Sequence, residues 1–350
     1  MAFPSRSLLK QVAGMAGVSA MTVSRVMRNS PKVRSATRIR VLQAAQKINY
    51  RPDPIAARLM ASVRKGRKTG AGATLALIRD IRPDSKRLGD IHHYVQLEDV
   101  RNRAKMLGYG VDEILLGEKG ITPARLCSIL KARGIEGALF SSEVPKAAMK
   151  EFDFSSFCCA TFGYGLQEVS VHRASTNMMQ GLLTTFAQLD TKGYKRIGMA
   201  VTPWADLRSN HTYSGALLHY QSSIPRRRRV PPLFFSEDKL ERNRRKFLMW
   251  MKANQPDAVI SFNGQIIDWI RNDAKAEIPC AIGFVVHDWT EQDAPLSGIN
   301  HNRQDVAAAA VDLVTTQLYH GEYGLPDVPR QVLISSTFVD LASCPNRREF

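Results

Sequence analysis

The spacing of apolar residues near the amino terminus predicts two short helices joined by a tight turn. In residues 11–29, apolar residues recur at helical spacing on both sides of Gly17, at Val12, Ala13, Ala16, Val18, Val23 and Val26. A glycine suits the turn because it adopts positive φ without strain. We expect Ser19 to cap the second helix, with its hydroxyl accepting a hydrogen bond from a backbone N–H two or three residues further on.

The outer face of the second helix is predicted to be small enough to approach the major groove of DNA. Its outward residues are Ala20, Met21, Thr22, Ser24 and Arg25. Arg25 can offer two donors to guanine O6 and N7, the commonest base-specific contact. The alternative on spacing alone is an ordinary helical hairpin within a larger core, because helix pairs with glycine turns are common.

A third helix completes a compact head. Ser35 is its expected N-cap, and Tyr50 closes the unit. We expect Ile39, Leu42 and Ile48 to face inward and Arg34, Arg38 and Arg40 to stay outside. Three short helices enclose little core, so the head should be only marginally stable alone.

The segment after the head is predicted to be a hinge helix and a linker. Pro52 and Pro54 prevent an upstream helix from continuing, and residues 55–60 are rich in helix formers. A helix this short needs a partner to order it, because nucleation is costly in water. The basic, glycine-rich run over 64–74 reads as a linker.

From residue 74, short apolar runs alternate with helical patterns. The expected strands are 74–81, 111–116, 137–141, 157–162, 196–201, 233–236, 258–262, 281–286 and 331–337. The expected helices lie near 93–107, 123–133, 174–192, 207–222, 238–254, 264–275 and 303–320. This alternation predicts parallel sheets with helices on both faces, and the body is long enough for two such lobes.

The location of the charge changes the interpretation of the head. Residues 1–70 hold 15 Lys and Arg against one acid, Asp53, whereas residues 71–350 hold 34 against 31. A basic head on a near-neutral body is typical of a nucleic-acid binder. Membrane-surface binding would need large apolar residues on an exposed face, and here the apolar residues are used at core spacing.

The remaining composition predicts a cytoplasmic protein without a metal or a cofactor. No stretch approaches the roughly 18 continuous apolar residues of a membrane span, and the amino terminus lacks the apolar run of a signal peptide. The five cysteines are scattered, with no C-x-x-C and no histidine at ligand spacing: Cys127, Cys158, Cys159, Cys280 and Cys344. We interpret them as reduced thiols.

The order of these elements resembles the lactose/galactose repressor (LacI/GalR) family of bacterial transcription regulators. The resemblance rests on VAGMAGVSAMTVSRVMRN, on VRSATRIRVLQAAQKINYRP and on residues 55–59, and it is diffuse after residue 60. It implies a homodimer that places one recognition helix on each half of a pseudo-palindromic operator in the nucleoid. It also implies a body of two doubly wound lobes of periplasmic-binding-protein type, which close around a small effector.

The resemblance implies roles for individual head residues. Ala20 and Met21 match the specificity pair, and Leu59 matches the leucine that two subunits wedge into the minor groove at the operator centre. The full set of expected DNA-binding residues is Ser19, Ala20, Met21, Thr22, Ser24, Arg25, Asn29, Tyr50, Ala56 and Leu59.

The expected domains follow from the same comparison. They are a helix-turn-helix domain over 1–52, a hinge and linker over 53–73 and an effector-binding and dimerisation body over 74–350. We expect the first lobe at about 74–162 and 287–336 and the second at about 168–286 and 340–350. The chain should cross between the lobes near 162–170, 285–295 and 336–342.

The body departs from the sugar-binding members of the family at matched positions. Their aspartate near residues 169–171 is missing and His172-Arg173 follows, their clamping arginine becomes Thr212, and their Gly-Tyr-Asp-Asp becomes residues 283–286. The polar residues that could still converge on an effector are Trp204, Asn210, His211, Thr212, Asn263, His287 and Asp288. An aromatic platform with Asn and His donors suits a polyol or small saccharide, although each residue alone also fits a capped turn or a surface loop.

Several alternatives remain open. A partner protein could regulate the same fold, or the body could have no effector at all. We interpret His92-His93 as solvated surface, with a weak effector contact as the alternative. We also interpret the run Arg226–Arg229 as solvated surface, with a second nucleic-acid contact as the alternative. A nucleotide-cofactor enzyme with a basic head is the alternative of another class, but the Gly70-Ala-Gly72 run precedes a strand and lacks the third glycine of a dinucleotide fingerprint. We therefore predict a DNA-binding regulator without catalytic residues.

Overall fold

In the computed structural model the described residues form a head and a body. They are residues 5–27, 33–50, 73–80, 95–117, 120–142, 144, 149–164, 166, 169–235, 240–262 and 264–348. Contacts separate Met1–Ala71 from a unit made of Gly72–Leu318 and Glu322–Phe350, and each unit is described by itself. Several predicted features lie outside the described residues: the hinge and linker with Ala56 and Leu59, Asn29, Asn263 and His92-His93.

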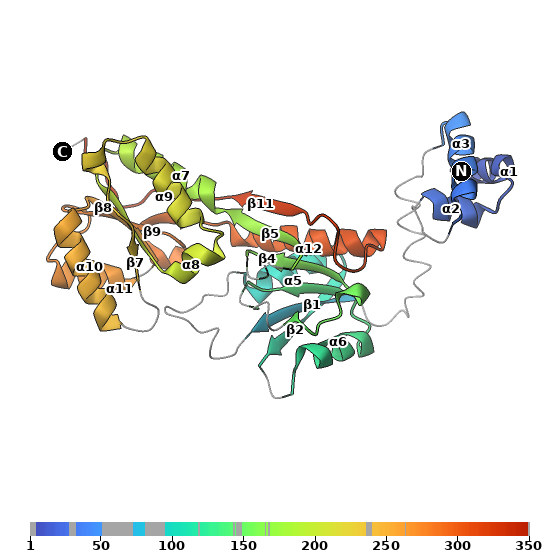
Figure 1. Ribbon diagram of the computed structural model, residues 1–350, viewed down its shortest axis with the longest axis horizontal. Coiled ribbons are helices and arrows are strands. Elements are labelled where there is room, and N and C mark those ends of the chain that lie inside the picture. The colour runs from blue at the N-terminus through green and yellow to red at the C-terminus, as the bar shows by residue number, and fades with distance from the viewer. Residues whose placement is uncertain are drawn as a thin grey trace. The chain divides into compact units, whose positions relative to one another are not determined.

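The head consists of three helices around a small apolar core. They are α1 (Ser5–Ala16), α2 (Ala20–Met27) and α3 (Ser35–Lys47) (Figure 1). The core contains Val12, Ala13, Ala16, Val23, Val26, Val41, Ala44 and Ala45. The inward positions predicted for the first two helices are therefore confirmed.

The inward face predicted for the third helix is wrong in part. Val41 is fully buried, whereas Ile39 and Leu42 are 55% and 47% exposed. Ile48 is half-buried against the core, as its position at the helix end allows. The helix uses the alternative apolar register through Val41, Ala44 and Ala45, whose small side chains let three short helices approach closely.

The first sheet of the body is entirely parallel. Its strands lie in the order β11-β5-β4-β3-β1-β2. Their bounds are β1 Ala73–Asp80, β2 Tyr109–Leu116, β3 Gly137–Phe140, β4 Cys158–Phe162, β5 His172–Asn177 and β11 Gln331–Ser335. Helix α6 (Pro123–Ala132) packs on one face with Ala76 and Ile78 of β1. Helices α5 (Leu97–Met106) and α12 (Arg303–His320) pack on the other face with the alternate residues Leu75 and Leu77.

The second sheet repeats this arrangement with one antiparallel edge strand. Its order is β12-β10-β9-β8-β6-β7, and β12 runs antiparallel to β10. The strands are β6 Ile197–Val201, β7 Leu233–Phe234, β8 Ala258–Ser261, β9 Gly283–Val286, β10 Ser297–Asn300 and β12 Thr337–Val339. Helices α7 (Met178–Thr191) and α9 (Thr212–Ser222) cover one face. Helix α10 (Leu240–Asn254), the short α11 (Gly264–Asp268) and the π-helical turn η5 (Trp269–Asp273) cover the other.

The predicted fold class is confirmed: a helical head precedes two α/β lobes built on mostly parallel sheets. The short elements α8 (Pro203–Arg208), η3 (Phe154–Ser156), η4 (Arg226–Arg228) and η6 (Glu291–Asp293) complete the chain. Among the described residues, no helix is both long and apolar enough to cross a membrane.

The chain passes between the two sheets later than predicted. It leaves the first sheet after β5, where Asn177 caps α7, and returns after β10, where Arg303 begins α12. The crossings expected near 162–170 and 285–295 are therefore wrong, because β5 and β10 were not predicted as strands. The third passage is at Ser336, between β11 and β12, at the start of the expected segment.

One glycine of the first sheet gives a direct test of this packing. A Cβ at Gly137 would lie 2.6 Å from Leu75 Cδ2 and 2.8 Å from Val314 Cγ1, whereas a Cβ at Gly110 would meet nothing closer than Thr74 Oγ1 at 3.4 Å. We expect Gly137→Ala to lower the free energy of unfolding by about 1–3 kcal/mol through overpacking. The matched variant Gly110→Ala should change it by less than about 0.5 kcal/mol. Urea unfolding followed by circular dichroism measures both, and equal effects would contradict the packing of α12 on β1 and β3.

Candidate nucleic-acid interface and effector site

The turn between α1 and α2 has the geometry that the sequence predicted. Gly17 has φ of +61°, and the Val18 N–H donates to the Ala13 carbonyl at 3.0 Å. Ser19 Oγ accepts from the Thr22 N–H at 3.2 Å, so Ser19 caps α2. These bonds satisfy the backbone at the turn and fix the angle at which α2 leaves α1.

The outer face of α2 presents small and polar side chains. Met21 is 58% exposed, Arg25 is exposed, and Ala20, Thr22 and Ser24 are half-buried. The inner face is closed by two buried valines. Apart from Met21 and Arg25, the side chains on this face are therefore small and leave the α2 backbone open to an approaching partner.

The head is cationic over all its described surface. Lys10, Arg25, Arg34, Arg40 and Lys47 are exposed, and the sequence has no acid between residues 5 and 50. Tyr50 is half-buried against the head core, and its N–H donates to the Ala45 carbonyl at 2.8 Å. Its side chain thus helps to hold the third helix, and a DNA contact from it stays a prediction.

In the body, the carboxyl ends of β9 and β10 bring a polar cluster together. His287 and Asp288 follow β9, His301 follows β10, and Arg303 begins α12. The rings of His287 and His301 lie 4.9 Å apart between centroids. The Tyr213 hydroxyl of α9 lies 3.2 Å from His287 Nδ1, and Arg303 pairs with Asp288. Ligands of open α/β sheets bind at this edge of the strands.

The same cluster joins the two sheets at the passages of the chain. Thr176 Oγ1, on β5 of the first sheet, donates to the His301 carbonyl at 3.0 Å. His301 Nδ1 lies 3.4 Å from the Ser336 hydroxyl, at the third passage. A change in the cluster therefore acts on the segments that link the lobes.

Burial controls the protonation of both histidines. Burial and the positive charge of Arg303 hold the pKa of His287 well below its ordinary value. Burial also lowers the pKa of His301, although Asp288 opposes the shift. Both imidazoles are therefore neutral near pH 7. His287 Nε2, His301 Nε2 and Asp288 Oδ1 are buried and have no hydrogen-bond partner among the described residues.

The other predicted effector residues lie at the turn between α8 and α9. Asn210 and His211 adopt positive φ of 56° and 57°, and both are exposed. His211 Nδ1 lies 3.3 Å from Asp206 Oδ2, and the Thr212 hydroxyl donates to the Ser209 carbonyl. These contacts match the capped-turn alternative considered for them. Trp204 lies half-buried on α8.

Sequence comparison assigns the head to a known group. Residues 8–53 match the family described as bacterial regulatory proteins, lacI family. The sucrose operon repressor of Escherichia coli is 57% identical over 68 residues, which make up 19% of this chain and 20% of that repressor. The match thus spans about a fifth of the length of these curated relatives.

Structural comparison extends the likeness over both lobes. The transcriptional regulator CelR, in complex with cellobiose, gives a TM-score of 0.58 at 19% identity over 96% of this chain and 99% of its own. The lac repressor dimer bound to operator and the anti-inducer ONPF gives 0.56 at 17% identity over 95% and 98%. Identities this low establish the shared fold. The lacI family match therefore covers the head, and the whole chain shares the fold of these regulators.

In this chain, sequence analysis found only part of the body cluster. His287 and Asp288 were predicted, whereas Tyr213, His301 and Arg303 were missed. His301 and Arg303 could have been found only by recognising residues 297–300 as a strand, whose carboxyl end carries them. Tyr213 lies on a helix face and carried no sequence signal beyond its aromatic ring.

The residues that replace the family aspartate take structural roles. Arg173 donates to the carbonyls of Gly163 and Leu166, at 2.6 and 3.1 Å. His172 Nδ1 accepts the Arg330 N–H at 2.8 Å. Both side chains thus hold the connections around β5.

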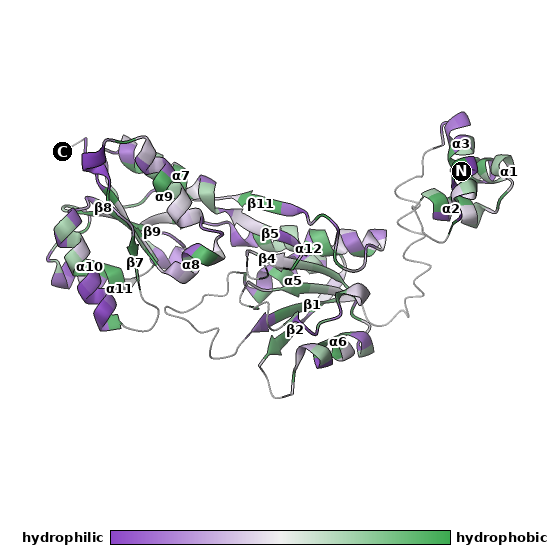
Figure 2. Cartoon of the chain, viewed as in Figure 1, coloured by the Kyte–Doolittle hydropathy of each residue, from purple (hydrophilic) through white to green (hydrophobic). Residues whose placement is uncertain are grey.

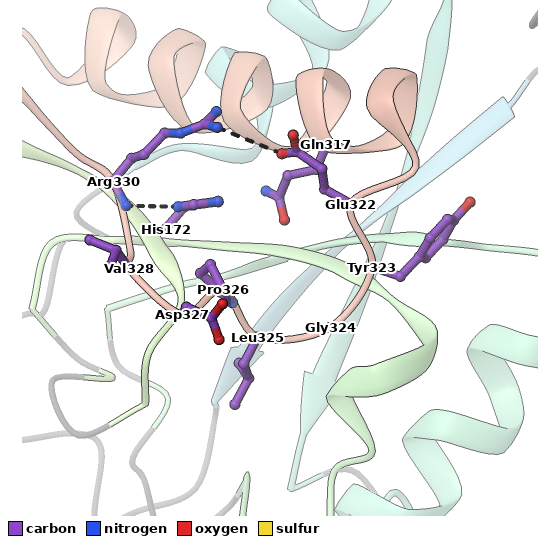
Figure 3. A pocket seen from close by; sticks show the side chains of 10 residues that line it. All are labelled: His172, Gln317, Glu322, Tyr323, Gly324, Leu325, Pro326, Asp327, Val328 and Arg330. Atoms are coloured by element: carbon purple, nitrogen blue, oxygen red, sulfur yellow. Dashed lines mark hydrogen bonds and ion pairs between the residues drawn. The ribbon is translucent and has the colours of Figure 1, made fainter. Parts of the chain in front are cut away.

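A separate cavity of about 250 Å³ lies beside the loop that joins α12 to β11 (Figure 3). Its lining includes His172, Gln317, Glu322 and Arg330. His172 and Arg330 lie at the amino ends of β5 and β11, and Gln317 and Glu322 lie at and after the end of α12. The His287 cluster lies instead at the carboxyl ends of strands. The cavity is therefore not the predicted effector site.

The buried histidines predict a loss of stability at mildly acidic pH. The folded pKa of His287 is depressed below the ordinary 6.5, so the unfolded chain binds the proton first as pH falls. The free energy of unfolding should therefore fall between pH 7.5 and 5.5, and His287→Gln should remove about 1 kcal/mol of that fall. The charged and polar groups facing His287 are Tyr213, His301, Asp288 and Arg303.

The matched control is His219→Gln, because His219 lies on the exposed side of α9. Urea unfolding of the three proteins at both pH values measures the difference. An identical pH dependence in wild type and His287→Gln would show that His287 takes up its proton equally in the folded and unfolded chains.

Proposed function

We propose that the protein is a sequence-specific DNA-binding transcription regulator of the LacI type, acting as a repressor. The observation that carries the proposal is the Ser19-capped helix α2, whose outer face is small, carries Arg25 and stands on a head without acids. A helix with that face can enter a major groove, and the surrounding cations attract the phosphates. The proposed contact residues in the described head are Ser19, Ala20, Met21, Thr22, Ser24, Arg25 and Tyr50. Asn29, Ala56 and Leu59 complete the set, by resemblance alone.

The proposed regulator works as a cytoplasmic homodimer. One head reads one half of a pseudo-palindromic site, so that two heads are needed for a stable complex. The lac repressor dimer bound to operator has the same fold as this chain and supports this arrangement.

We further propose that a small polyol or saccharide binds at the carboxyl ends of β9 and β10. Three buried polar atoms there, His287 Nε2, His301 Nε2 and Asp288 Oδ1, have no hydrogen-bond partner among the described residues, although the last two lie 3.9 Å apart. They match the hydroxyl groups of such a ligand. The contacts of His301 with Thr176 and Ser336 would transmit binding to the segments between the lobes. A coupling of this kind is typically worth about 1–3 kcal/mol. Regulation by a partner protein is the second candidate, because the effector residues of the sugar-binding members are missing at matched positions.

Base recognition by Arg25 can be tested by substitution. After selection of bound sites from random DNA, Arg25→Ala should weaken binding to the selected duplex by about 1–3 kcal/mol and relax preference at one base position. The matched control is Lys47→Ala, which removes an exposed cation from α3 and should weaken all duplexes alike. Equal losses on selected and random DNA for Arg25→Ala would assign Arg25 to phosphate contact instead.

Effector binding can be tested by thermal unfolding of the full chain in the presence of saccharides and polyols. A ligand at a hundred times its Kd stabilises the folded state by about 2.7 kcal/mol, which raises the unfolding midpoint by several degrees. Asp288→Asn should abolish this increase, whereas Asp268→Asn, at an exposed position on α11, should retain it. If no polyol or saccharide stabilised the wild type, regulation by a partner protein would replace this proposal.

A further inference from the structure

Nine cationic side chains from three segments gather at the amino-terminal ends of the strands of the second sheet. They form what we call the cationic patch: Lys192, Lys195, Arg196, Arg226, Arg227, Arg228, Arg229, Arg347 and Arg348. The segments are in direct contact, since Arg228 Nε donates to the Lys195 carbonyl at 3.0 Å and the Arg347 N–H donates to the Lys192 carbonyl at 2.8 Å. Figure 2 shows strongly hydrophilic ribbon beside the carboxyl terminus.

The acids that contact the patch within the described residues are already paired or hydrogen-bonded. Asp190 pairs with Arg228 at 2.5 Å, and Asp340 pairs with Lys192 at 2.7 Å. Asp257 accepts the backbone N–H groups of Lys195 and Arg196 at 2.7 and 2.9 Å. Nine cations against three acids exceed the balance of the whole body, where residues 71–350 hold 34 against 31. The patch therefore has an excess of six cations, against an excess of three for residues 71–350 as a whole.

The outer cations of the patch are held in position while their charges stay open to solvent. Lys195, Arg226, Arg227, Arg229 and Arg348 are exposed, and none forms an ion pair with another described residue. The backbone beneath them is fixed, because Arg196 donates to the Arg227 carbonyl and Arg229 donates twice to the Ile224 carbonyl, at 3.2 Å. Mutual repulsion between fixed like charges is a cost that an anionic partner would relieve.

We propose that the cationic patch binds the phosphate backbone of duplex DNA, as a second DNA contact separate from the helix-turn-helix head. Four of the five outer cations are arginines, whose planar guanidinium groups bind phosphate oxygens bidentately. An acidic protein partner would require an apolar centre of contact. None of the large apolar residues exposed on the described surface belongs to residues 190–196, 224–231 or 340–348. The contact is therefore electrostatic and independent of base sequence.

The test measures whether the full-length protein links two duplexes. One duplex is fixed to beads, the protein is bound to it at low salt, and retention of a second, labelled duplex of unrelated sequence is measured. The patch variant carries Lys195→Gln, Arg226→Gln, Arg227→Gln and Arg348→Gln, none of whose side chains forms a hydrogen bond to a described residue that folding would need. We expect it to retain at least fivefold less labelled duplex than the wild type, while its binding to the beads changes less than twofold.

The matched control removes three arginines and one lysine elsewhere on the same lobe. Arg242, Arg245, Arg271 and Lys275, all exposed on or after α10, are replaced by Gln. This control should retain the labelled duplex as the wild type does. Thermal unfolding of all three proteins shows whether each is folded at the assay temperature. If the fourfold variant is unfolded, the double variant Arg226→Gln/Arg227→Gln replaces it. We expect the double variant to lose an intermediate amount of the labelled duplex.

Three results would overturn the proposal. The first is equal retention by the wild type and the patch variant, which would assign the linking of duplexes to the heads. The second is equal loss in the patch variant and the control, which would show a general effect of charge. The third is unchanged duplex retention together with weaker binding of poly-glutamate by the patch variant, which would assign the patch to an acidic protein. Loss of bead binding in Arg25→Ala concerns only the head, so failure of the proposed function is seen separately.

Discussion

The arrangement of the body depends on one constraint: the chain passes between the two sheets three times, and the passages meet around His301. The backbone carbonyl of His301 accepts from Thr176 of β5, and its ring reaches Ser336 at the last passage. Arg303, two residues further on, begins α12 and pairs with Asp288 of the second lobe. The two sheets, which have separate apolar cores, are thus joined by polar contacts at this point.

Sequence patterns predicted the elements whose buried residues are mostly apolar. The two valines of α2, the strands β1, β3 and β4, and the helix α12 carry the regular spacing that burial against one neighbour requires. The sequence patterns failed at β5, where most of the buried residues are polar. β5 contains Arg173, Ser175 and Thr176, each of which has less than a tenth of its surface exposed. The sequence of β5 therefore resembles the start of the helix that follows it.

The same limit explains why the outer face of α2 was predicted in full and the polar cluster around His287 only in part. Residues on one short helix are placed by its period, so Ala20 to Arg25 could be assigned to a face directly. The cluster combines residues from β9, β10, α9 and α12, which only the sheet order brings together. Asn210 and His211 were predicted as effector residues because their side chains suit a ligand. In the structure both adopt left-handed conformations in the turn that ends α8 and begins α9.

Helix α12 also acts as a single rigid strut. Its 18 residues, at about 1.5 Å each, span about 27 Å between Arg303 at the junction of the lobes and His320, after which the chain reaches the amino end of β4. Val306, Val311 and Val314 clamp it to the first sheet along its length. A tilt of α12 imposed through the Arg303–Asp288 ion pair would therefore also displace Gln317, which lines the cavity near the other end of the helix.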